Sequence, residues 1–149
     1  MLKKIFFVLL LLLFLVVGCS KDKVFVLEDY LEDTTFVIEL QSYGKTEYLI
    51  TFDDMNKDAF LEEIKNLSIV EYGEVERGAG GYSYRLVCGN VIVEDNNGAH
   101  LFVDGVELTN KQSCWKQDSL ADFVNSIVEI QDDGVYELIN TVNVEKVES

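Results

Sequence analysis

The sequence contains no proline and only one histidine, His100, among its 149 residues. Without proline, and without a Ser/Gly-rich spacer after Cys19, the chain has no stretch that is typical of a long linker. A single histidine excludes metal sites built from several histidines and leaves a serine-type triad one candidate base. We find no internal repeat and no low-complexity segment. The composition therefore predicts one domain in which any histidine-dependent chemistry would have to use His100.

Basic residues are also scarce. Twelve lysines and arginines stand against 27 aspartates and glutamates, for a formal net charge of −15. Nucleic-acid binding requires a basic face, so the composition disfavours it. An anionic membrane surface would repel the chain, whereas a basic protein or a divalent cation would be attracted to it. The alternative is that the acidic surface serves solubility alone.

The longest apolar run is too short to cross a bilayer. Ile5 to Val17 is 13 residues long, whereas a membrane-spanning helix needs about 20 apolar residues. Lys3 and Lys4 precede the run, and this combination is typical of a secretory signal peptide. We therefore predict that residues 1–18 are a signal peptide.

The predicted signal ends in Val16-Val17-Gly18-Cys19 and not in an A-x-A-like cleavage site. This stretch resembles the lipobox of bacterial lipoproteins, in which aliphatic and small residues precede a cysteine. The resemblance implies cleavage before Cys19 and a diacylglycerol on its sulfur, with residues 19–23 as a short tether. Two acyl chains give stable anchoring. The alternative is an uncleaved anchor that happens to contain a cysteine.

The lipobox resemblance also bears on location. In the Gram-negative version of the family, Ser20 beside the cysteine favours the outer membrane. In a Gram-positive cell the chain would instead be held at the outer face of the cell membrane. Cleavage would remove two lysines and no acidic residue, which leaves 131 residues with a net charge of −17.

The remaining residues, 24–149, combine strand and helix patterns in one expected domain. Residues 24–33 fit either a short helix or an extended lead-in, while helical spacing predicts one helix near 53–67 and another after Ser119. Alternation and turn residues predict strands over 34–40, 46–52, 69–76, 82–88 and 135–147, with a tight meander over 91–108. We therefore expect an α+β fold, an antiparallel sheet with about two helices packed on one face.

Two cysteines, Cys88 and Cys114, would remain after lipidation of Cys19. Because an exported location permits disulfides, one Cys88–Cys114 bridge is the simplest expectation, with two separate buried thiols as the alternative. Zinc binding by these cysteines and His100 would need a fourth ligand and a close cysteine pair. Residues 113–115, Ser-Cys-Trp, superficially resemble the surroundings of a papain-type nucleophile. That family's upstream Gly and Cys and its downstream His are absent, which disfavours a cysteine protease.

The turns of the meander carry the residues that we would choose for binding, because loop tips on a rigid sheet often carry function. These candidates are Asp95, Asn96, Asn97, His100 and Asp104. The alternative is that they only form turns, with Asp95 and His100 as a cross-strand charge pair. An EF-hand alignment on Gly98 would place Val93 at the first ligand position, which excludes that motif. A weak surface calcium site stays open, but we expect no metal and no cofactor.

Tyr84 to Leu108 is somewhat similar to the core of small lysozyme-inhibitor lipoproteins. The outline is carried by Tyr84, Cys88, Val91, Val93, Ala99, Leu101, Gly105 and Leu108, within about a fifth of the mature chain. That family's later inhibitory loop with Ser-Gly and Tyr is not evident. The resemblance implies an acidic inhibitor or immunity protein against a basic envelope enzyme.

The sequence as a whole predicts a non-catalytic binding module at the cell envelope. A hydrolase that uses carboxylates and a purely structural envelope component are the alternatives. Binding to a basic partner should weaken with salt, because salt screens exposed charges. An enzyme should instead lose its activity when one or two specific acidic residues are changed.

Overall fold

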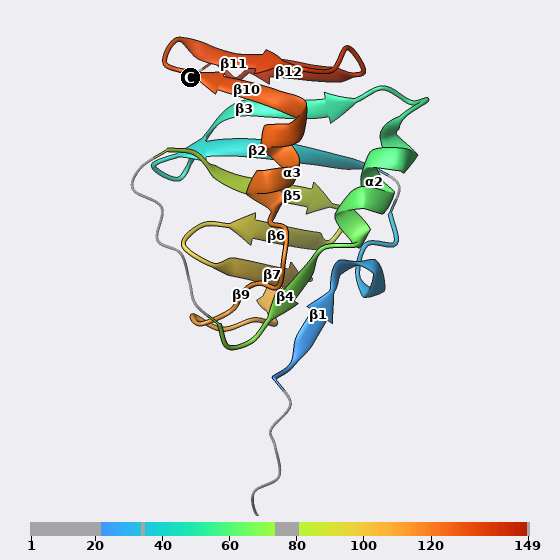
Figure 1. The fold of residues 1–149 in the computed structure, drawn as a ribbon, viewed down its shortest axis with the longest axis vertical. Helices are drawn as coiled ribbons and strands as arrows, with labels where there is room; N and C mark the ends of the chain where they lie inside the picture. The colour runs from blue at the N-terminus through green and yellow to red at the C-terminus, as the bar shows by residue number, and fades with distance from the viewer. Residues whose placement is uncertain (1–21, 34, 74–80, 149) are drawn as a thin grey trace, which may run out of the picture.

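The computed structural model describes residues 22–33, 35–73 and 81–148. They form mostly antiparallel β-structure with two α-helices, which confirms the α+β class (Figure 1). The predicted signal peptide, Cys19 and the first part of the tether lie outside the described residues. Within the described part, no helix is long and apolar enough to cross a membrane.

Seven strands form the main sheet, in the order β12-β3-β2-β5-β6-β7-β8. Their bounds are β2 Phe36–Ser42, β3 Lys45–Phe52, β5 Ser83–Cys88, β6 Val91–Asp95, β7 Ala99–Val103, β8 Val106–Glu107 and β12 Val142–Lys146. The strands expected near 34–40 and 46–52 are β2 and β3, which form a hairpin, and the meander expected over 91–108 is confirmed as β6–β8. Their turns contain Gly44, Gly98 and Gly105 at positive φ, a conformation in which glycine has no Cβ to clash.

A second, three-stranded sheet has the order β1-β4-β9. Its strands are β1 Val24–Val26, β4 Ser68–Val70 and β9 Cys114–Trp115, and a 3₁₀ turn η1, Leu27–Asp29, follows β1. The strands are two or three residues long and come from distant parts of the chain. Local sequence patterns therefore gave no sign of their pairing.

The prediction of a single final strand over 135–147 is wrong. Two strands, β10 Val128–Gln131 and β11 Gly134–Glu137, form a separate hairpin, and β12 joins the main sheet beside β3. The chain turns between β11 and β12, where the N–H of Val142 donates to the carbonyl of Ile139 at 3.1 Å. This turn contains neither glycine nor proline and lies among β-branched residues, so the sequence pattern did not indicate that the strand ends there.

The two helices are α2, Lys57–Lys65, and α3, Leu120–Ile127. The helix expected after Ser119 is confirmed and begins with a capping box: Ser119 Oγ accepts from the N–H of Asp122 at 3.0 Å, and Asp122 Oδ2 accepts from the N–H of Ser119 at 2.8 Å. These bonds satisfy two N–H groups that a helix start leaves free.

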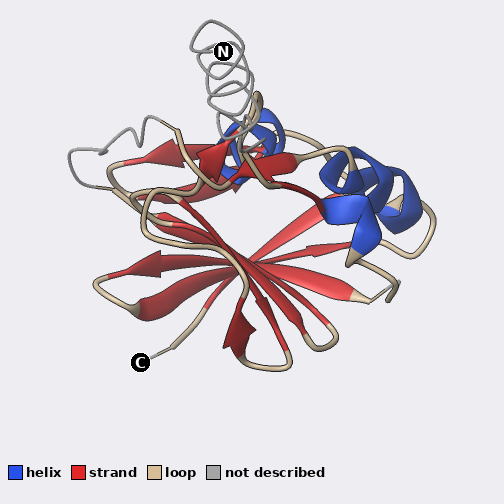
Figure 2. Ribbon diagram, turned by 90° about the horizontal axis from the view of Figure 1, so that it is seen from below, coloured by secondary structure: helices blue, strands red, loops and turns tan. Residues whose placement is uncertain are grey.

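One face of the main sheet holds the core. Ile50, Ile38, Leu86, Val93 and Leu101 lie side by side across five strands, and each is 0% exposed. They belong to one hydrophobic cluster with buried residues of both helices. Figure 2 shows the helices and the three-stranded sheet on the same side of the main sheet. The opposite face of β5, β6 and β7 is not covered by either described helix, and we call it the outer face.

Candidate functional site

The structure does not bring the five predicted binding residues together. Asp95, Asn96 and Asn97 lie where β6 passes into β7, whereas Asp104 lies in the turn after β7. The five residues of β7 separate these turns by about 15 Å. Asp104 instead joins the β5–β6 turn, where its Oδ1 accepts from Asn90 Nδ2 at 2.8 Å. The candidates therefore form no single cluster.

The expected cross-strand pair of Asp95 and His100 is wrong. Asp95 pairs with Ala99, and His100 pairs with Glu94, because the loop contains three residues, Asn96 to Gly98, and not two. A change of one residue in register moves a side chain to the other face of a sheet. Asp95 consequently lies on the core face and His100 on the outer face.

Asp95 holds helix α3 against the sheet. Its Oδ2 accepts from the backbone N–H of Ala121 at 2.9 Å, one of the N–H groups that the first turn of a helix leaves free. Burial raises the pKa of Asp95, and this hydrogen bond works in the opposite direction. Asp95 is therefore a structural residue of the β6–α3 contact.

The raised pKa of Asp95 predicts a pH dependence of stability. A carboxyl group whose pKa is higher in the folded chain stabilises it most at low pH, and this contribution fades as pH rises through the folded pKa. Asp95→Asn keeps an oxygen acceptor without the buried charge, so we expect its loss of stability between acidic and neutral pH to be smaller than that of the wild type. Asp95→Ala removes the acceptor and should cost about 1 kcal/mol. Urea unfolding at several pH values checks both; equal pH profiles for the wild type and Asp95→Asn would contradict the assignment.

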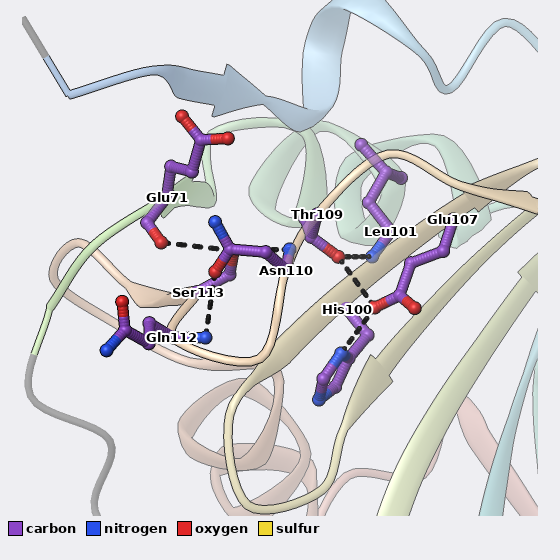
Figure 3. A network of polar contacts seen from close by, with 8 residues as sticks. All are labelled: Glu71, His100, Leu101, Glu107, Thr109, Asn110, Gln112 and Ser113. Atoms are coloured by element: carbon purple, nitrogen blue, oxygen red, sulfur yellow. Dashed lines mark hydrogen bonds and ion pairs between the residues drawn. The ribbon is translucent and has the colours of Figure 1, made fainter.

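His100 belongs to a polar network at the β7–β8 edge (Figure 3). Its Nδ1 lies 2.8 Å from Glu107 Oε1, and Thr109 Oγ1 donates to the same oxygen at 3.2 Å. Thr109 Oγ1 also accepts from the N–H of Leu101 at 3.0 Å. The network fixes the imidazole ring and leaves its Nε2 without a partner among the described residues.

Figure 3 also shows Ser113, which lies in the loop before β9. It is 0% exposed, and no other polar side chain of the described ranges is classed as buried. Its Oγ accepts from the N–H of Asn110 at 3.0 Å and lies 3.5 Å from the carbonyl oxygen of Glu71. A buried hydroxyl held in this way fastens the loop and is poorly placed to attack a substrate.

The chemistry available at this edge is limited. A histidine oriented by a carboxylate can act as a general base, but it needs a reactive group within hydrogen-bond reach. Burial raises the pKa of Cys114, which disfavours the thiolate that a cysteine nucleophile requires. In the parts of the chain that the structure describes, no three His, Cys, Asp or Glu side chains could hold a metal ion.

The predicted Cys88–Cys114 disulfide is absent, and both cysteines are free thiols. Cys88 ends β5 in the main sheet, and its Sγ donates to the carbonyl oxygen of Asp33 at 3.3 Å. Cys114 lies in the three-stranded sheet and packs against Gly73, where an added Cβ would collide with the sulfur. The two residues thus belong to different sheets with different neighbours.

The free thiols predict a simple labelling result. In the full chain with Cys19→Ser, denatured without reductant, iodoacetamide should add two labels by intact mass. In the folded chain Cys88 should react more slowly than Cys114, because Cys88 is 1% exposed and a buried thiol is inert. A denatured chain that takes no label until it is reduced would show that the disulfide forms after all.

Charged side chains cross the outer face in one line. Glu39, Arg85, Glu94 and His100 are direct neighbours in register across β2, β5, β6 and β7, and we call them the charged row. Arg85 Nη1 lies 3.2 Å from Glu39 Oε2, and Arg85 Nε lies 3.3 Å from Glu94 Oε1. Because one guanidinium serves two carboxylates, and Glu107 adds a third beside His100, the row carries an excess of acidic groups.

An apolar line runs beside the charged row. Val37, Val87, Ile92 and Phe102 are direct neighbours across the same four strands, and we call them the apolar row. All four are partly exposed, while the residues next to them in each strand point into the core. An exposed apolar strip bordered by polar residues is one of the features that mark an interaction site.

No protein-family model, curated protein or solved structure matches the chain. The features of the outer face are therefore the main guide to function. Sequence reasoning included His100 among its candidates but missed the rest of the charged row and all of the apolar row. The alternation in residues 82–88 pointed to two faces of a strand, but the neighbours of Arg85 depend on pairings with distant segments.

Proposed function

We propose that the chain is a bacterial lipoprotein, anchored through Cys19, whose folded part binds a basic protein at the cell envelope without catalysing a reaction. The observation that carries the proposal is the outer face, where the apolar row lies beside the acidic charged row. Buried apolar area would supply affinity, and the carboxylates would attract and orient a basic partner. The net charge of −15 acts in the same direction over longer distances.

In this proposal the two faces of the main sheet have different roles. Both helices, together with the three-stranded sheet, would seal the core face, as the buried residues of α2 and α3 suggest. The outer face would then be free for a partner. An antiparallel sheet commonly has one face packed on a core and the other exposed.

The anchor would set the orientation of the folded part. β1 begins at Val24, five residues after Cys19 in the sequence, and lies at the end of the molecule opposite β10, β11 and β12 (Figure 1). We propose that the β1 end faces the bilayer. The membrane would be the outer membrane in a Gram-negative cell and the outer face of the cell membrane in a Gram-positive one.

A sharper version of the same proposal is an inhibitor or immunity protein against a basic envelope enzyme, as the resemblance of residues 84–108 suggests. The competing hydrolase needs carboxyl groups that face one substrate. The carboxyl group with a raised pKa, Asp95, is instead bound to the start of α3. This observation favours binding over hydrolysis.

The proposal is tested by a crosslinking pull-down with the full chain in envelope extract at low and high salt. We expect one discrete basic protein that is lost at high salt, because salt screens the exposed carboxylates. The double variant Val87→Thr/Ile92→Thr, which keeps β-branched residues, should capture less of it. Val24→Thr is the matched control away from the outer face. Capture of no partner at either salt would contradict the proposal.

A further inference from the structure

Tyr43 occupies the tip of the β2–β3 hairpin in an unusual conformation. Ser42 pairs directly with Lys45, so Tyr43 and Gly44 form a two-residue turn, with φ values of 50° and 77°. A turn with two left-handed residues favours asparagine followed by glycine. A bulky residue is an outlier there, because its Cβ crowds the neighbouring carbonyl oxygen.

The fold gains no buried contact from this tyrosine. Its relative exposure is 104%, so the ring lies wholly in solvent. Asparagine at this position would relieve the backbone strain and leave every core contact unchanged. A tyrosine with this strained backbone and no buried contact therefore points to a function other than stabilising the fold.

The turn that carries Tyr43 is joined to the charged row. Gln41 Nε2 donates to Glu39 Oε2 at 3.0 Å, and Thr46 Oγ1 donates to the same oxygen at 3.3 Å. This is also the oxygen that Arg85 Nη1 contacts at 3.2 Å. Tyr43 lies two residues after Gln41 in the sequence, at the end of the strand that carries Glu39.

We propose that Tyr43 is an anchor residue that contacts a lysine- or arginine-bearing segment of a basic polypeptide bound on the outer face. This inference rests on the proposed function and names a contact within it. The face of a tyrosine ring attracts a cation, and the carboxylates of the charged row attract neighbouring basic residues. Tyrosine is frequent at binding hot spots because it gives a large contact area at a small cost in conformational entropy.

A phage-displayed library of random peptides tests the contact. The full chain in detergent micelles is the bait, at low salt, and the affinities of the selected peptides are then measured for the wild type and for variants. Tyr43→Asn should bind the selected basic peptides about tenfold more weakly. Tyr43→Phe should stay within roughly twofold, because it keeps the ring face. Tyr72→Asn is the matched control at another exposed tyrosine.

Thermal unfolding separates binding from folding. Tyr43→Asn should raise the melting temperature by about 3 °C, since the asparagine suits the left-handed turn. Weaker binding by a more stable chain supports the anchor role. Equal binding by Tyr43→Asn and wild type, or an equal loss in Tyr72→Asn, overturns it and leaves the proposed function standing. Failure of the wild type to select lysine- or arginine-bearing peptides overturns both.

Discussion

Replacing Leu86 with alanine is expected to lower the free energy of unfolding by about 3 kcal/mol. Leu86 is 0% exposed and lies between Ile38 and Val93 on the core face, both of them also 0% exposed. Truncation would leave a cavity that the neighbouring strands cannot readily fill. Denaturant unfolding followed by circular dichroism measures the loss.

The next residue, Val87, provides the matched control. It is partly exposed and belongs to the apolar row of the outer face, so Val87→Ala should cost roughly 1 kcal/mol or less. The contrast follows from the alternation of side chains along β5. Equal losses in the two variants would mean that both faces of β5 are covered, which would contradict a free outer face.

A second large effect is expected at the anchor. Cys19→Ser should abolish incorporation of a labelled fatty acid completely, because the proposed lipidation places the acyl chains on this residue. The variant should also keep residues 1–18 and migrate as a larger chain than the processed wild type. Metabolic labelling and gel mobility measure both effects.

The other cysteines are the controls for this experiment. Cys88→Ser and Cys114→Ser should incorporate the fatty acid like the wild type, since neither residue belongs to the stretch that resembles a lipobox, Val16 to Cys19. A Cys19→Ser chain that still carries the label would refute lipidation at Cys19.

The elements with local signals were predictable from the sequence. Ser119 predicted the start of α3, and the turn residues and alternation of residues 91–108 predicted the meander that the structure confirms. Each signal lies within a few residues of its effect, because caps and tight turns are local hydrogen-bonding problems. The three-stranded sheet has no comparable signal, since it joins Val24 to Val70 and Val70 to Cys114.

The candidate site was less predictable because it depends on register. One extra residue in the β6–β7 loop placed Asp95 against α3 and turned His100 to the outer face. The charged row depends on the pairing of Glu39 with Arg85, which are 46 residues apart in the sequence. Local patterns indicate which residues alternate, but they do not indicate which distant strand becomes the neighbour.

The most direct test of the account is site-specific photo-crosslinking in cells that make the full chain. A photoreactive phenylalanine analogue at Phe102 would lie in the apolar row, whereas the same analogue at Tyr72 would lie beside the three-stranded sheet. We expect an adduct with one discrete basic protein from position 102 and none from position 72. An adduct from position 72 alone, or none from position 102, would contradict binding at the outer face.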